Sequence, residues 1–96
     1  MISIKIKSTL NIKKIIGASE ITLDIPDGST LEEVLSIMVN KWGEDLSSQI
    51  LNPADKKILP YIRIMINGRD IAFLNRLNTE IHAGDQILLL PPAGGG

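Results

Sequence analysis

Three stretches of the chain alternate apolar and polar residues with a period of two, the pattern of strands that bury one face. These stretches are residues 2–7, 20–25 and 61–66. The third ends at Asn67-Gly68, a pair typical of tight turns between paired strands. The pattern therefore predicts three strands, each with one face in a core and the other toward water.

Residues 31–42 instead carry apolar residues at helical spacing. The stripe consists of Leu31, Val34, Leu35, Met38, Val39 and Trp42. Ser29 or Thr30 offers an N-cap, and Glu32 or Glu33 stands three residues later, the spacing of a capping box. Gly43 supplies a stop signal. We predict one three-turn helix here, with the apolar stripe, Met38 and Trp42 included, packed in the core.

The remaining segments are predicted to be connections. Residues 9–17 fit a short helical turn ended by Gly17, and residues 44–60 predict a long, mostly polar loop. Residues 71–81 predict short turns and a brief edge strand. The expected apolar anchors of this last segment are Ile71, Phe73, Leu74, Leu77 and Ile81.

A final strand is predicted over residues 86–90, giving the order strand, strand, helix, strand, short edge element, strand. A single helix covers only one face of such a sheet. We therefore predict an α+β fold of the β-grasp (ubiquitin-like) type, a mixed four- to five-stranded sheet with one main helix on one face. This domain would span residues 1–92, followed by a flexible glycine-rich tail over residues 93–96.

The final strand differs from the others because both of its faces are apolar. Ile87 and Leu89 continue the alternation into the core, which leaves the other two leucines on the open face near Met65. Exposed apolar patches mark partner surfaces, and the two prolines that follow stop further pairing. We predict a partner-binding surface made of Leu88, Leu90, Pro91 and Pro92. The alternative is that the 44–60 loop covers the patch.

The tail Ala93-Gly94-Gly95-Gly96 is the candidate working group. Glycine has no Cβ, so Gly94 and Gly95 form a thread that fits a channel too narrow for side chains. Extended backbone spans up to about 3.6 Å per residue, so the tail would reach on the order of 13 Å and deliver the Gly96 carboxylate to another protein. The alternative is a frayed end or a linker.

Composition narrows the functional classes. Ten basic and eleven acidic residues nearly cancel, and only three aromatic residues occur, so we expect no nucleic-acid partner. With no cysteine and one histidine, His82, we predict no catalytic residue and no metal site. No apolar run approaches the roughly 20 residues that cross a bilayer, so we expect no membrane partner and a cytoplasmic location.

The C-terminal third resembles a known family. Gly84-Asp85-Gln86-Ile87, then Leu90-Pro91-Pro92 and a glycine pair, is similar to the small subunit of molybdopterin synthase (the MoaD type), among the ubiquitin-like sulfur carriers. The resemblance extends upstream through Ile66-Asn67-Gly68-Arg69, Phe73-Leu74 and Leu77-Asn78-Thr79 and back to residues 10–17, so it covers nearly the whole chain. It implies that an E1-like enzyme uses ATP to adenylate Gly96 and that a sulfur donor displaces AMP.

The resulting thiocarboxylate would enter the large subunit of molybdopterin synthase. There it would donate sulfur to a cyclic pterin precursor and so build the dithiolene group that binds molybdenum or tungsten. The chain itself would be a non-catalytic subunit without a bound cofactor. Three alternatives stay open. The chain could be a ubiquitin-like modifier joined to lysines through Gly96, a sulfur carrier for thiamin or another pathway, or a plain β-grasp binding module.

Overall fold

The computed structural model describes residues 1–55 and 57–91, which form a mixed five-stranded sheet. Its strands are β1 (Ile2–Ser8), β2 (Glu20–Ile25), β3 (Arg63–Ile66), β4 (Arg69–Asp70) and β5 (Gln86–Leu90). They lie in the order β2-β1-β5-β3-β4. β1 and β5 are parallel, whereas the other pairs are antiparallel. The predicted mixed sheet is confirmed.

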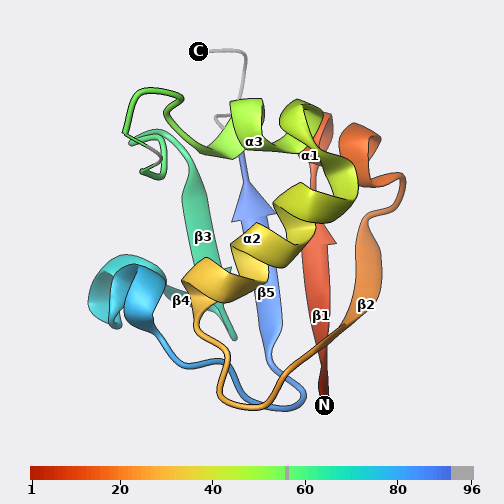
Figure 1. Cartoon of the computed structure of the whole chain (residues 1–96), viewed down its shortest axis with the longest axis vertical. Helices are drawn as coiled ribbons and strands as arrows, with labels where there is room; N and C mark the ends of the chain where they lie inside the picture. The colour runs from red at the N-terminus through yellow and green to blue at the C-terminus, as the bar shows by residue number, and fades with distance from the viewer. Residues whose placement is uncertain (56, 92–96) are drawn as a thin grey trace.

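The helices α1 (Leu10–Ile16), α2 (Leu31–Trp42) and α3 (Glu44–Ile50) all lie on one face of the sheet, as Figure 1 shows. The core fills the space between these helices and the sheet. Its fully buried side chains include Ile4, Ile6, Leu31, Met38, Ile64, Ile87 and Leu89. We call the opposite face of the sheet, which no described helix covers, the outer face.

The period-two pattern of β1 and β2 is confirmed by burial. Ile4 and Ile6 are buried, whereas Lys5 and Lys7 lie on the outer face. Their ammonium nitrogens lie 3.7 and 3.8 Å from the carboxylate of Glu20 on β2. Because these pairs are exposed, solvent screens them and they add little to stability. The β1–β2 half of the outer face is therefore charged and hydrated.

Helix α2 begins where the capping-box spacing predicts. Thr30 is the N-cap: its hydroxyl oxygen accepts from the Glu33 N–H at 3.4 Å, and its own N–H donates to the Glu33 carboxylate at 3.2 Å. Four residues of the predicted stripe, Leu31, Val34, Leu35 and Met38, are buried in the core, whereas Val39 is only half-buried. Trp42 is only half-buried, because it lies in the last turn, where the Lys41 ammonium sits 5.2 Å from its ring centre.

The prediction of a loop over residues 44–60 is wrong at its start, because residues 44–50 form α3. Gly43 adopts φ 70°, which ends α2 and turns the chain directly into the next helix. Leu46 and Ile50, one helical turn apart, are fully buried against the core. The apolar side of α3 therefore packs on the same face of the sheet as α1 and α2, and α3 leaves the outer face open.

The segment after β3 is partly as predicted. Asn67 and Gly68 have φ 52° and 83°, the conformation of a tight hairpin turn. A brief edge strand is present as the two-residue β4, but it lies just before residues 71–81, the segment in which it was predicted. Two 3-10 turns follow, η1 (Ile71–Phe73) and η2 (Arg76–Asn78). Ile71 is buried, but the prediction that Phe73 anchors the segment is wrong, since 86% of it is exposed. None of the described helices is long and apolar enough to cross a membrane.

The capping box generates a stability prediction. Replacing Thr30 by alanine removes the hydroxyl that accepts from the Glu33 N–H, while the backbone N–H of residue 30 can still donate to Glu33. The loss of this capping bond should lower the free energy of unfolding by about 1 kcal/mol. Thr9 is a matched control, because it is the N-cap of α1 but makes no side-chain capping bond. Thermal unfolding of both variants tests this: equal losses for Thr30→Ala and Thr9→Ala would contradict it.

The burial of α3 generates a second prediction. Leu46→Ala should cost about 2–5 kcal/mol, because it leaves a cavity between α3 and the core. Ser48 is exposed on the same helix, so Ser48→Ala serves as the control. Denaturant unfolding measures both variants. A loss below about 1 kcal/mol for Leu46→Ala would show that α3 is not part of the cooperative core.

Candidate functional site

The candidate site begins where β5 ends, and β5 is the middle strand of the sheet. It pairs with β1 on one side and β3 on the other, with Leu89 opposite both Ser8 and Ile64. Ile87 and Leu89 are fully buried beneath it. The backbone is thus held up to Leu90 by strand pairing on both sides and by core packing beneath it. Pro92, Ala93 and the predicted tail residues Gly94, Gly95 and Gly96 lie outside the described residues.

The two apolar faces of β5 separate as the alternation predicts. Leu88 and Leu90 lie on the outer face and are half-buried. Leu88 is opposite Met65 of β3 and Lys7 of β1, and Leu90 is opposite Arg63. The prediction that Leu88 lies beside Met65 is confirmed. The β5–β3 half of the outer face is therefore partly apolar, in contrast to the charged β1–β2 half.

Two exposed apolar side chains flank the end of β5 and were not predicted from sequence. Leu10 follows β1, which runs parallel to β5, and 55% of it is exposed. Tyr61 precedes β3, which runs antiparallel to β5, and 58% of it is exposed. Both therefore lie at the end of the sheet where the chain leaves β5. The alternation of the third strand, extended to Tyr61, is the only signal that could have indicated one of them.

Leu10, Tyr61, Leu90 and Pro91 also line one open groove of about 1070 Å³. Leu10 has φ 53°, a left-handed conformation that is unfavourable for a large side chain. We call Leu10, Tyr61, Leu88, Leu90 and Pro91 the exit surface. These apolar side chains lie around the point at which the chain leaves the sheet, and the lining of the groove also includes Lys57, Arg63 and Arg76.

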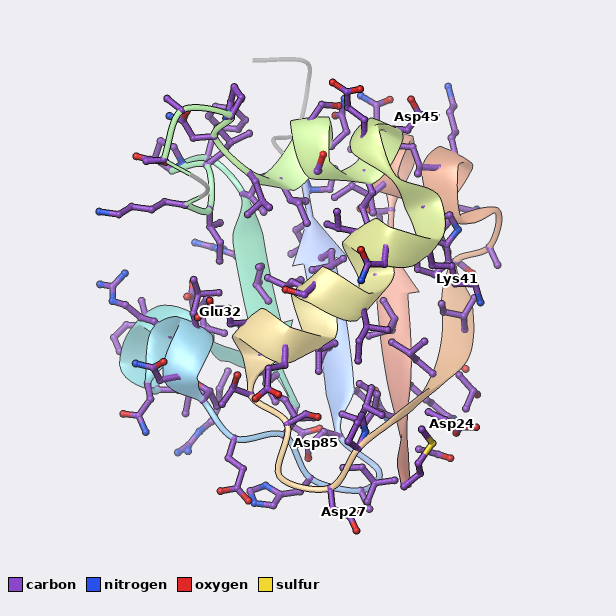
Figure 2. All side chains as sticks on the ribbon, in the orientation of Figure 1. Asp24, Asp27, Glu32, Lys41, Asp45 and Asp85 are labelled. Atoms are coloured by element: carbon purple, nitrogen blue, oxygen red, sulfur yellow. The ribbon has the colours of Figure 1, made fainter. Side chains whose placement is uncertain are left out.

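The carboxylates are dispersed and occupied by structural roles. Figure 2 shows Asp24, Asp27 and Glu32 on different elements, with Asp45 near the opposite end of the molecule. Asp24 accepts a hydrogen bond from the Ser3 hydroxyl at 2.6 Å. These four described carboxylates therefore do not form a close pair for acid–base chemistry.

His82 lies in the turn before β5, at the end of the sheet away from the exit surface. Its Nε2 is 3.3 Å from Glu80 and its Nδ1 is 4.0 Å from Asp85, with the imidazole largely exposed. Asp85 is already used, since it accepts from the His82 N–H and the Asn67 amide. In residues 1–55 and 57–91, no group of three acidic, histidine or cysteine side chains could hold a metal ion.

Comparison with known proteins identifies the family. The profile of the ThiS family matches residues 11–96. A putative sulfur carrier protein of Archaeoglobus fulgidus is 28% identical over 67 residues, which covers 70% of this chain and 74% of that protein. Small archaeal modifier protein 3 of Haloferax volcanii is 24% identical over 84 residues, 88% of each chain. Sulfur carrier protein CysO of Mycobacterium tuberculosis is 30% identical over 70 residues, 72% and 74% of the two chains.

Solved structures share the fold. Small archaeal modifier protein 1 from Methanosarcina acetivorans superposes with a TM-score of 0.81 at 28% identity, over 100% of this chain and 98% of that one. A putative molybdopterin converting factor subunit 1 from Pyrococcus furiosus gives 0.75 at 19% identity, over 97% and 100%. A chain of the BexX/CysO complex from Amycolatopsis orientalis gives 0.75 at 19%, over 97% and 99%.

These superpositions confirm the predicted β-grasp, ubiquitin-like fold. The family match extends from α1 through β5 and includes the glycine-rich residues. The chain belongs to the ThiS family of ubiquitin-like sulfur carriers.

Proposed function

We propose that the chain is a sulfur carrier that works as the small subunit of molybdopterin synthase. In this proposal an E1-like enzyme adenylates the carboxylate of Gly96, and a sulfur donor converts it to a thiocarboxylate. The observation that carries the proposal is the position of the exit surface. An apolar docking area surrounds the end of the central strand, so a partner bound there meets the chain where it leaves the body.

The chemistry explains why partner enzymes are needed. A free carboxylate is a poor electrophile, so its oxygen must first attack the α-phosphorus of ATP and release pyrophosphate. Attack by a sulfur nucleophile at the acyl carbon then forms a C–S bond and breaks the C–O bond to AMP. The described residues offer no acid–base pair for these steps. The chain supplies the acyl group and the docking surface, and its partners supply catalysis.

The assignment to molybdopterin formation is supported by the sequence around β5. Gly84-Asp85-Gln86-Ile87 and Leu90-Pro91-Pro92 resemble the molybdopterin synthase small subunit. In that role the large subunit of the synthase would dock on the exit surface and enclose the tail. The sulfur would then pass to a pterin precursor. Sulfur carrier protein CysO, whose name does not mention molybdopterin, shares 30% identity with the chain, so a different sulfur acceptor is the nearest alternative.

A second candidate function is protein modification. The relatives named small archaeal modifier proteins support it, since modifier protein 3 matches 88% of this chain. Both functions pass through the same acyl adenylate. They differ only in the nucleophile, which is sulfur for a carrier and a lysine amine for a modifier.

Intact-mass analysis tests the role of Gly96. After incubation with ATP, an E1-like enzyme and sulfide, the chain should gain the mass difference of one sulfur replacing one oxygen. A variant lacking Gly96 should keep the same unfolding temperature, because the described core ends before it, yet stay unmodified. Adding the synthase large subunit and its pterin precursor should then produce the dithiolene. Lysine-linked conjugates instead would support the modifier, and no mass change with a competent enzyme would contradict both functions.

The exit surface is tested by placing a charge in it. Leu90→Asp should weaken binding to the activating enzyme about tenfold or more, because an unpaired carboxylate would be desolvated in the interface. Thr22→Asp is the control, since Thr22 is exposed on the outer face of β2, two strands away. Calorimetric titration compares the two variants. Equal affinities would remove the exit surface from the mechanism.

A further inference from the structure

Phe73 is the most exposed large hydrophobic side chain of the described residues, with 86% of its surface open to solvent. The backbone beneath it is nonetheless held firmly. Asp70 Oδ1 accepts from the Ala72 N–H at 2.9 Å, and the Leu74 N–H donates to the Ile71 carbonyl at 3.0 Å. Ile71 anchors the turn in the core. The fold therefore presents the aromatic ring to solvent on a fixed support.

A shallow, open hollow of about 540 Å³ lies beside the ring. Its apolar part consists of Phe73 and Met65, and the hairpin turn at Gly68 forms another wall. Apart from Gly68 itself and its two chain neighbours, no atom lies within 4 Å of where a Cβ of Gly68 would be, so this turn is open to solvent. The hollow can accept one aromatic or large apolar group.

The rim of this hollow carries an excess of positive charge. It contains two guanidinium groups, Arg63 and Arg69, and one carboxylate, Asp70. Arg63 Nε lies 3.5 Å from Asp70 Oδ2, and the other oxygen of Asp70 caps η1. Within the part of the chain that the structure describes, Arg69 has no carboxylate at ion-pair distance. An acidic ligand would therefore find one guanidinium unpaired and another only partly neutralised.

We call Met65, Phe73, Arg63 and Arg69 the Phe73 surface. Figure 1 shows the η1–η2 segment, in light blue, beside the β3–β4 edge at the lower left, whereas β5 runs toward the top. The Phe73 surface adjoins the exit surface, because Met65 and Arg63 lie opposite Leu88 and Leu90. Phe73 and Arg69 are not among the residues that line the groove at the end of β5, so a protein bound in that groove can leave them open.

We propose that the Phe73 surface binds an acidic–aromatic segment of a partner protein. An aromatic side chain of the segment packs on Phe73 and Met65, and flanking carboxylates pair with Arg69 and Arg63. The charge of the rim selects this chemistry, because a basic segment would be repelled by both guanidinium groups. The proposal goes beyond the sulfur-carrier function and does not depend on activation of Gly96.

The test uses two matched probes, the N-acetylated and C-amidated tripeptides Glu-Trp-Glu and Lys-Trp-Lys. Each is titrated into the ¹⁵N-labelled full chain and followed by NMR. The acidic peptide should shift the amides of Gly68, Arg69 and Phe73 saturably, and bind about fivefold tighter than the basic one. Neither ATP nor an activating enzyme is present, so the result is independent of sulfur transfer.

Variants connect the binding to the surface. Phe73→Ala should abolish saturable shifts, and Arg69→Glu should reverse the charge preference. Tyr61→Ala should bind normally, because it removes an exposed ring at the exit surface. Equal binding of both peptides, no saturation, or shifts centred on Leu90 would overturn the proposal. Concentration-dependent self-association in sedimentation that Phe73→Ala removes would also overturn it, since the occupant would then be a second copy of the chain.

Discussion

The structure depends on the placement of β5 at the centre of the sheet. A central strand must satisfy its backbone hydrogen bonds on both sides, and β5 does so with β1 and β3. Its inward residues, Ile87 and Leu89, are fully buried beneath the helices. The chain therefore cannot shift along its neighbours without breaking two ladders and moving core residues to the outer face. The point where the backbone leaves the sheet is fixed by the whole fold.

The same placement explains the apolar outer face of β5. A strand buried on both faces reads as a continuous apolar run. Helices cover only one face of this sheet, so Leu88 and Leu90 remain half-exposed on the other. On the β1–β2 side the outer face carries Lys5, Lys7 and Glu20 instead. The apolar residues are thus concentrated around the end of the central strand, where a docking area serves the proposed delivery of the terminus.

Local patterns predicted the elements whose signals are local. The alternation of β1 and β2, the capping box at Thr30 and the turn at Gly68 each involve residues close in sequence, and each is found as predicted. Helix α3 was missed because its seven residues contain only Leu46 and Ile50 as large apolar residues inside a polar segment. So short a helix is stabilised by tertiary burial more than by its own propensity. Phe73 was misassigned because residue type does not reveal which way a 3-10 turn points its side chains.

The residues of the exit surface also divide into those that sequence alone could locate and those that could be found only from the fold. Leu88 and Leu90 follow from alternation within one strand, so sequence alone located them. Leu10 and Tyr61 join them only once the strand order is known, because they flank β5 through its two different neighbours, β1 and β3.

In the proposed sulfur-carrier function, this geometry allows two kinds of partner contact, one around the end of β5 and one at Phe73. Only one protein at a time can enclose the end of β5, so successive partners must exchange at the exit surface. Phe73 is supported by its own turn and does not line the groove at the end of β5, although Met65 and Arg63 adjoin the exit surface through Leu88 and Leu90. A partner that holds Phe73 and Arg69 without covering those leucines could remain bound while the exit surface passes from the activating enzyme to the sulfur acceptor. An exposed aromatic ring on a rigid support, away from the chain end, is what such a second contact requires.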